Sequence, residues 1–271
     1  MTKEELLDSP SYCYWRYVPA YPAELLDAVV EEFRLDRPHG TMLDFGYGGG
    51  EATFDFAPFF DRVLAWNQDT DILWLADGAI KDEAVKNITL EEKGEADIAD
   101  LPDKSLSLVV VAQSMHDIKA EQFFGEIESK IKGNGGGIAI ISGSFTTPDG
   151  LFARRMVEER DRVISNEVGR YIRVTEKKVE KTTRNVNEKD YTTLLHEAGF
   201  RKVQEQVFET IVERKIEDII GWIYANQLFP RQKFGKKAAK FEKRLTKELK
   251  QLSPDGVFRD KMRFTLITAK K

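Results

Sequence analysis

Short apolar runs alternate with amphipathic segments along residues 20–145, and this alternation limits the folds open to the chain. Runs typical of buried strands lie at 42–45, 62–66, 106–112 and 138–141. Segments with helical periodicity lie before and between them, near 21–34, 51–60, 70–80 and 123–131. Strands that alternate with helices favour an α/β fold with a doubly wound parallel sheet. The stretch 85–96 is ambiguous, with one short strand around 88–90.

The pattern changes after residue 146. Residues 150–190 are charged and mostly helical in character, and a helix at 189–198 and a strand at 201–210 follow. Helical stretches at 215–228 and 232–252 and a last strand at 263–268 complete the chain. We therefore expect an N-terminal aromatic arm (1–20) followed by a core (21–145). The remaining residues, 146–271, should form helical cap insertions and the last two strands of the core sheet.

Composition excludes several classes of protein. The 271 residues carry 41 basic and 46 acidic side chains, a net charge of −5 that argues against a protein that coats nucleic acid. The single cysteine, Cys13, excludes an internal disulfide framework and a multi-cysteine zinc site, and no His/Cys cluster suggests a metal. We expect a cytoplasmic protein without a membrane segment. The oligomeric state is not predicted.

The glycine-rich stretch Asp44-Phe45-Gly46-Tyr47-Gly48-Gly49-Gly50 directly follows the first strand. Ligands of open α/β sheets bind beyond the carboxyl ends of such strands. A phosphate-binding loop would need Lys-Ser or Lys-Thr after the glycines, but Glu51-Ala52-Thr53 stands there. A dinucleotide fingerprint needs G-x-G-x-x-G and an acidic residue about 20 residues on. The chain has G-x-G-x-G, and Asn67 at the end of the second strand.

A third interpretation is a resemblance. Asp-x-Gly-x-Gly-x-Gly, with matching segments at 62–76, 94–105, 106–117 and 123–141, resembles the class I S-adenosylmethionine-dependent methyltransferases. The chain is most similar to their small-molecule type, which includes trans-aconitate and ubiquinone-pathway enzymes. The resemblance implies a Rossmann-like, doubly wound, mostly parallel seven-stranded sheet with helical cap insertions. It also implies that residues 21–145 bind S-adenosylmethionine and that the cap covers a small-molecule acceptor.

The resemblance assigns roles residue by residue. Asp44 would hold the amino group of the cofactor, Asn67 would accept from the ribose hydroxyls, and Asp97 would bond the adenine amino group. Ile98 would pack on the adenine ring, and Gln113 would face the methionine end. The full predicted cofactor site is Asp44, Gly46, Tyr47, Gly48, Gly50, Asn67, Gln68, Asp97, Ile98 and Gln113.

Two of these positions depart from the family pattern. Asn67 stands where the family usually has Asp or Glu, so charge-assisted bonds become neutral ones and cofactor binding should weaken roughly ten-fold. Tyr47 stands where the family often has a small residue and could narrow the pocket. Because of these departures, two alternatives to a methyltransferase stay open. The chain could bind the cofactor but catalyse another reaction such as a cyclisation, or it could be a non-catalytic binding module.

His116 follows the fourth strand and is the candidate general base, needed only if the acceptor must lose a proton. A structural histidine is the alternative. The aromatic residues of the arm either close over the ligands or pack on the core; they are Tyr12, Tyr14, Trp15, Tyr17 and Tyr21.

Two basic segments are interpreted as ordinary helix surface. Arg154, Arg155, Arg160 and Arg162 could grip a carboxylate, but the acidic residues among them favour a solvated helix face. The run 231–250 carries nine basic residues with Phe241, Leu245 and Leu249 interspersed. It could contact an acidic partner, but the spacing favours an amphipathic cap helix with a basic outer face.

Overall fold

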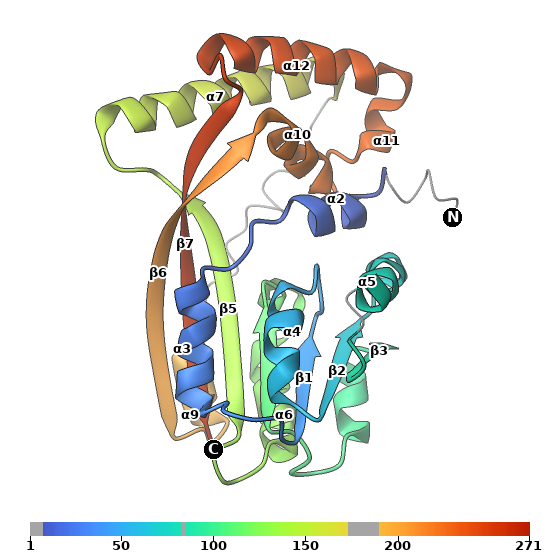
Figure 1. The fold of residues 1–271 in the computed structure, drawn as a ribbon, viewed down its shortest axis with the longest axis vertical. Coiled ribbons are helices and arrows are strands. Elements are labelled where there is room, and N and C mark those ends of the chain that lie inside the picture. The colour runs from blue at the N-terminus through green and yellow to red at the C-terminus, as the bar shows by residue number, and fades with distance from the viewer. Residues whose placement is uncertain (1–7, 83–84, 173–189) are drawn as a thin grey trace. The chain divides into compact units, whose positions relative to one another are not determined.

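A computed structural model describes residues 8–82, 85–172 and 190–271 (Figure 1). Contacts divide the chain into two compact units. The described part of the first, called the helical unit, is 8–19, 145–172 and 209–262. The described part of the second, the sheet unit, is 20–82, 85–144, 190–208 and 263–271.

Seven strands form one sheet in the order β3-β2-β1-β4-β5-β7-β6. Their bounds are β1 Thr41–Phe45, β2 Arg62–Asn67, β3 Ile88–Glu92, β4 Leu108–Ala112, β5 Gly137–Thr146, β6 Lys202–Lys215 and β7 Val257–Lys270. Strands β1 to β5 pair in parallel. The last strand runs the other way, because Gly137 lies against Ala269 and Gly143 against Phe264. The predicted doubly wound, mostly parallel seven-stranded sheet is confirmed.

Helices cover both faces of the sheet in the sheet unit (Figure 1). They are α3 Ala23–Phe33, α4 Glu51–Phe56, α5 Thr70–Asp82, α6 Ala120–Lys130 and α9 Tyr191–Glu197. Successive strand residues face opposite sides, so Leu43 and Phe45 pack with Phe123 and Phe124 of α6. On the other face, Ala65 of β2 packs against α5. Three short 3₁₀ turns complete this unit, at Ala57–Phe59, Glu95–Asp100 and Met115–Asp117.

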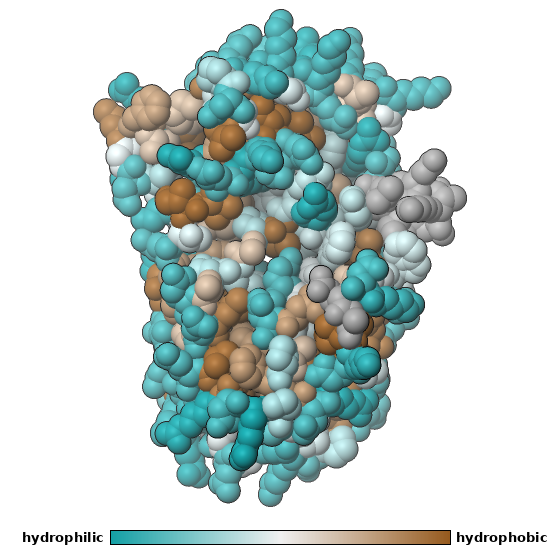
Figure 2. Space-filling model, viewed as in Figure 1, coloured by the Kyte–Doolittle hydropathy of each residue, from teal (hydrophilic) through white to brown (hydrophobic). Residues whose placement is uncertain are grey.

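The helical unit has its own apolar core. Its helices are α2 Pro10–Tyr17, α7 Leu151–Tyr171, α10 Ile216–Ala225, α11 Arg231–Phe234 and α12 Ala238–Leu252, with a 3₁₀ turn at Gly235–Lys237. Phe241, Leu245 and Leu249 are buried along one side of α12, and the rings of Phe234 and Phe241 lie 4.4 Å apart. Figure 2 shows hydrophilic side chains over the opposite side of this helix. The amphipathic helix predicted for the basic run is therefore confirmed.

The structure departs from the sequence expectations at several points. Residues 10–17 form a helix within the expected arm, and Cys13 is buried in the core of the helical unit. Strands β6 and β7 are longer than expected because each continues from one unit into the other. Residues 173–189, expected to be mostly helical, lie outside the described residues. In the part of the chain that the structure describes, no helix combines the length and the hydrophobicity of a membrane span.

The solvated face expected for the arginines of α7 is wrong for Arg160. This guanidinium is buried and pairs with the buried carboxylate of Asp260 on β7. Arg154, Arg155 and Arg162 are exposed, as expected. A local charge pattern cannot reveal a partner that lies 100 residues further along the chain.

Candidate functional site

The loop between β1 and α4 is bound closely to the neighbouring strand β2. The backbone N–H groups of Gly46 and Tyr47 both donate to the carbonyl oxygen of Trp66, each at 2.9 Å. Gly46 and Gly50 have φ values of 82° and 92°, which glycine adopts without strain. A Cβ atom at Gly46 would also overlap the side chain of Ser114. The loop therefore needs glycine both for its backbone conformation and for close packing.

This loop lies where the strand order reverses. Strand β1 pairs with β2 on one side and with β4 on the other, and the chain leaves β1 toward β2 and returns at β4. The Ser114 hydroxyl, just after β4, donates to the Phe45 carbonyl at 2.9 Å and so joins the ends of these two strands. The ends of β1 and β4 thus lie at the position where open α/β sheets bind ligands.

Asp44 places a buried carboxylate at the start of the loop. Its side chain is 4% exposed and accepts a hydrogen bond from the Thr53 hydroxyl on α4. Burial raises its pKa to about 7; the Thr53 bond lowers it in part, and the nearby Glu51 carboxylate raises it further. Burial also raises the pKa of Glu51. Because Asp44 is buried beside another carboxylate, a positively charged ligand group would stabilise its ionised form.

Tyr47 turns its side chain into the core. Its ring is fully buried with Ala65, Ile72 and Ala76, and burial raises its pKa. The hydroxyl has no hydrogen-bond partner, and a Cβ at Gly50 would overlap it. Gly48 lies half-buried beyond it in the loop. The tyrosine therefore supports the glycine loop from the side of the core.

Asn67, at the end of β2, holds the glycine loop. Its amide nitrogen donates to the Tyr47 carbonyl, and its side-chain oxygen accepts from the Asp69 N–H at 2.7 Å. An aspartate could not make the first of these bonds, because a carboxylate has no donor. Gln68 packs so closely on Gly94 that a Cβ there would overlap its amide group.

The two residues predicted to bind adenine lie in the 3₁₀ turn Glu95–Asp100. The Asp97 carboxylate accepts from the Gly94 N–H at 2.8 Å and so caps its own turn. Ile98 has no exposed surface and packs in the main core cluster. This differs from the expected contact between Ile98 and a ring, since a fully buried side chain offers no surface to a ligand.

Gln113 connects the ends of β4 and β5. Its side-chain oxygen accepts from the Gly143 N–H at 2.9 Å, and its backbone has a φ of 61°, unusual for a residue other than glycine. His116 is exposed in the next 3₁₀ turn. Both residues follow β4, and the bond of Gln113 fastens this end of the strand to β5.

The structure thus brings most predicted residues to one edge of the sheet. Contacts run from Gln68 with Gly94, through Asn67 with Tyr47 and Phe45 with Ser114, to Gln113 with Gly143. The sequence pattern predicted no role for Thr53, although a hydroxyl in the first turn after the glycines is a usable signal. Within the described residues, no group of three or more His, Cys, Asp and Glu side chains could hold a metal ion.

Comparisons with known proteins agree with this geometry. No family model matches the chain. It is 24% identical over 118 residues to a Saccharomyces cerevisiae protein named "Probable S-adenosylmethionine-dependent methyltransferase CRG1", a match that covers 43% of the chain and 40% of the relative. It is 27% identical over 133 residues to a Dictyostelium discoideum protein named as a methyltransferase, a match that covers 49% and 47%. The chain thus spans less than half the length of these curated relatives.

A solved structure shows the same fold over most of the chain. The protein comes from Anaeromyxobacter dehalogenans and is described as a type II methyltransferase. It superposes with a TM-score of 0.57 at 19% identity and covers 93% of the chain and 97% of that protein. In its doubly wound sheet, its glycine loop at the switch point and its matches to curated methyltransferases, the chain is similar to the class I S-adenosylmethionine-dependent methyltransferases.

Proposed function

We propose that this chain transfers the methyl group of S-adenosylmethionine to a small-molecule acceptor. The observation that carries the proposal is the buried Asp44 carboxylate, with a pKa raised to about 7, at the start of a glycine loop. The amino group of S-adenosylmethionine is a cation that would favour the ionised carboxylate. The carboxylate and the glycines of this loop therefore suit the cofactor.

The remaining cofactor contacts would come from the same edge of the sheet. Gly46, Gly48 and Gly50 would let the backbone approach the amino-acid and ribose portions. The Asn67 oxygen, which already accepts from Asp69, would offer its second lone pair to a ribose hydroxyl. Asp97 and Gln68 would reach the adenosine, and Gln113 the methionine end.

The bound cofactor would supply a methyl group on a sulfonium, ready for in-line displacement. The chain would contribute orientation and exclusion of water, effects worth up to about 7–11 kcal/mol in favourable cases. His116 would take a proton only from an acceptor that must lose one.

We extend the proposal to the organisation of the chain. Residues 21–145 would bind the cofactor, and the cap insertions within 146–271 would bind the acceptor. A small-molecule acceptor of the trans-aconitate or ubiquinone-pathway kind and a cytoplasmic location belong to the same proposal. The free, buried thiol of Cys13 suits a reducing compartment.

Calorimetry with S-adenosylmethionine and S-adenosylhomocysteine tests the cofactor site. We expect both to bind, and Asp44→Asn to weaken S-adenosylmethionine binding by about ten-fold or more, since a charge-assisted bond becomes neutral. Asp77→Asn is the matched control, because Asp77 is an exposed carboxylate on α5. No heat with either ligand at millimolar concentration would overturn the proposal. Binding without transfer of a labelled methyl group to any of a broad acceptor panel would contradict the enzymatic part.

A further inference from the structure

The helical unit contains a cavity that none of the cofactor residues lines. Its volume is about 950 Å³, and its walls come from α2, α7, α10 and the segment after α10. Such a volume accommodates a small organic molecule. Three aromatic side chains form part of the walls, namely Tyr14, Trp222 and Phe229.

No charged side chain is among the described residues that line this cavity. Apart from the Tyr14 hydroxyl, its polar side chains are Ser165 and Asn226. The Asn226 oxygen accepts from the Leu228 N–H at 2.8 Å, which directs the amide NH₂ to other acceptors. A charged ligand would lose its hydration here without gaining an ionic partner, so the lining favours an uncharged one.

A second cavity of the same unit gives the contrast. It measures about 700 Å³ and is lined by charged groups that include Asp8, Arg231 and Glu242. Arg231 bonds both of these carboxylates, and Tyr224 donates to Glu242 at 3.0 Å. The helical unit therefore does place charged side chains around a cavity, and the uncharged lining described for the larger cavity is specific to that cavity.

Trp222 is held in place as a wall of the larger cavity. Its ring lies 6.1 Å from that of Tyr14 and meets that of Phe145 edge-on at 5.9 Å. The Arg214 guanidinium lies 5.9 Å from the Trp222 ring and 4.8 Å from the Phe145 ring, within range of cation–π attraction.

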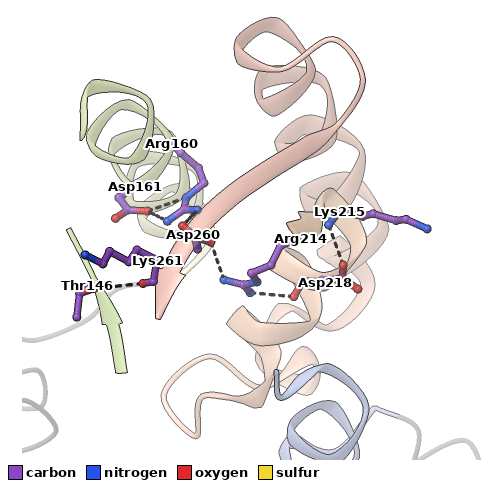
Figure 3. A network of polar contacts seen from close by, with 8 residues as sticks. All are labelled: Thr146, Arg160, Asp161, Arg214, Lys215, Asp218, Asp260 and Lys261. Atoms are coloured by element: carbon purple, nitrogen blue, oxygen red, sulfur yellow. Dashed lines mark hydrogen bonds and ion pairs between the residues drawn. The ribbon is translucent and has the colours of Figure 1, made fainter. Parts of the chain in front are cut away.

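Arg214 is itself fixed. Figure 3 shows its guanidinium between the Asp260 carboxylate and the Asp218 backbone carbonyl, with contacts of 3.4 and 3.2 Å. Its Nε, which is buried, has no hydrogen-bond partner, so the aromatic faces are a large part of its surroundings. The ring of Trp222 is thereby pre-organised, which reduces the entropy lost when a ligand stacks on it.

We propose that this cavity binds an uncharged, ring-bearing small molecule stacked on Trp222. On the condition that the proposed methyltransferase function holds, this molecule is the methyl acceptor. Aromatic stacking and burial of apolar surface supply the affinity, and Asn226 and Ser165 select for a polar substituent on an otherwise apolar molecule.

Fluorescence titration with N-phenyl-1-naphthylamine, an uncharged two-ring probe, tests the cavity in the full chain. We expect saturable binding that Trp222→Ala weakens by about ten-fold, whereas Trp222→Phe retains most of it. Trp74→Ala is the control, since Trp74 is 61% exposed on α5 and should leave binding unchanged. Equal binding by Trp222→Ala and the unmodified chain would overturn the proposal.

Asn226→Asp provides a variant that keeps side-chain size if the alanine variant fails to fold. A carboxylate in an uncharged cavity should weaken binding of the uncharged probe by about ten-fold. The anionic analogue 1-anilinonaphthalene-8-sulfonate should bind the unmodified chain at least about ten-fold more weakly than the uncharged probe. Tighter binding of the anion would contradict the assignment of an uncharged ligand.

Calorimetry with S-adenosylmethionine on the same samples separates the two proposals. Cofactor binding without probe binding would overturn the cavity proposal alone. Probe binding without cofactor binding would overturn the proposed function and leave the cavity assignment intact. Labelled methyl transfer then tests the acceptor: uncharged ring-bearing compounds should be methylated, with KM raised by Trp222→Ala. Transfer to charged compounds only would refute the acceptor assignment.

Discussion

Asp44 shows how one residue combines fold and chemistry. The strand that carries it is buried, so its carboxylate has lost most of its hydration, and Thr53 supplies one neutral hydrogen bond in return. Its pKa is raised to about 7 from an ordinary value of 3.8. The folded chain therefore retains a proton that the unfolded chain releases, and the stability contributed by this group falls as the pH rises from about 4 to about 7.

This pKa predicts the pH dependence of cofactor binding. The proton must leave Asp44 before the carboxylate can pair with the amino group of S-adenosylmethionine. Affinity should therefore rise by about ten-fold per pH unit below pH 7 and level off above it. Calorimetry between pH 5 and 8 measures this slope, and Asp44→Asn should flatten it. An unchanged slope in the variant would show that another group titrates.

Replacing Asn67 by aspartate should lower the stability of the fold but tighten cofactor binding. Asn67→Asp removes the donor to the Tyr47 carbonyl and should lower the free energy of unfolding by about 1–3 kcal/mol. The same carboxylate accepts more strongly from ribose hydroxyls and should tighten S-adenosylmethionine binding by about ten-fold. Urea unfolding and calorimetry measure the two effects, with Asn134→Asp in an exposed turn as the control. A variant of unchanged stability would contradict the role given to Asn67.

At the scale of elements, a buried ionic cluster joins α7, β7 and the end of β6. Asp260 pairs with both Arg160 and Arg214, and all three side chains are buried (Figure 3). Burial disfavours the charged form of Arg160 and lowers its pKa. The interaction with the Asp260 carboxylate outweighs this effect, so the pKa of the Arg160 guanidinium is raised. For Arg214, burial dominates and lowers the pKa. Asp260, helped by the more exposed Asp161, thus offsets the burial of Arg160, whereas Asp260 does not offset the burial of Arg214.

Removing that carboxylate should be costly. Asp260→Asn leaves two buried guanidinium groups without a charged partner in the interior and should lower the free energy of unfolding by about 3–5 kcal/mol. Urea unfolding measures the loss. Asp161→Asn is the control, because the side chain of Asp161 is 58% exposed and its pair with Arg160 should contribute about 0–1 kcal/mol. A loss below about 1 kcal/mol for Asp260→Asn would show that water reaches the cluster.

The elements also show where sequence periodicity succeeds. The helical spacing of Phe241, Leu245 and Leu249 predicts the buried side of α12, and the apolar run 106–112 predicts β4. Helix α2 was not predicted, because its aromatic residues have no single apolar stripe. The burial of Arg160 was not predicted either, since its partner comes from a distant strand.

At the scale of the whole molecule, the two units depend on the same three strands. The boundaries between the units fall within β5, β6 and β7, so the sheet and the helical unit are continuous through the backbone. The cofactor residues all belong to the sheet unit, whereas the charged and the uncharged cavity both belong to the helical unit. Ligand binding to each unit can therefore be measured separately.

Because the cofactor residues belong to the sheet unit, S-adenosylmethionine binding should stabilise that unit. At a concentration 100 times its Kd, it should raise the free energy of unfolding by about 2.7 kcal/mol. Hydrogen exchange should show slower exchange in the glycine loop and the residues after β2 and β4, with little change around Trp222. Protection confined to the helical unit would contradict the assigned cofactor site.

The sequence by itself determined the order of strands and helices within residues 20–145 and the position of the glycine loop after the first strand. These features depend on local periodicity and on backbone freedom, which neighbouring residues express. The class of cofactor came from the resemblance to a known family. Only the tertiary structure decided that Asn67 holds the Tyr47 carbonyl, that Asp44 is buried beside Thr53, that Arg160 meets Asp260, and that Trp222 borders an uncharged cavity. Asn67 and Tyr47 are 20 residues apart and Arg160 and Asp260 are 100 residues apart. The energies of all these contacts depend on burial, which no local pattern records.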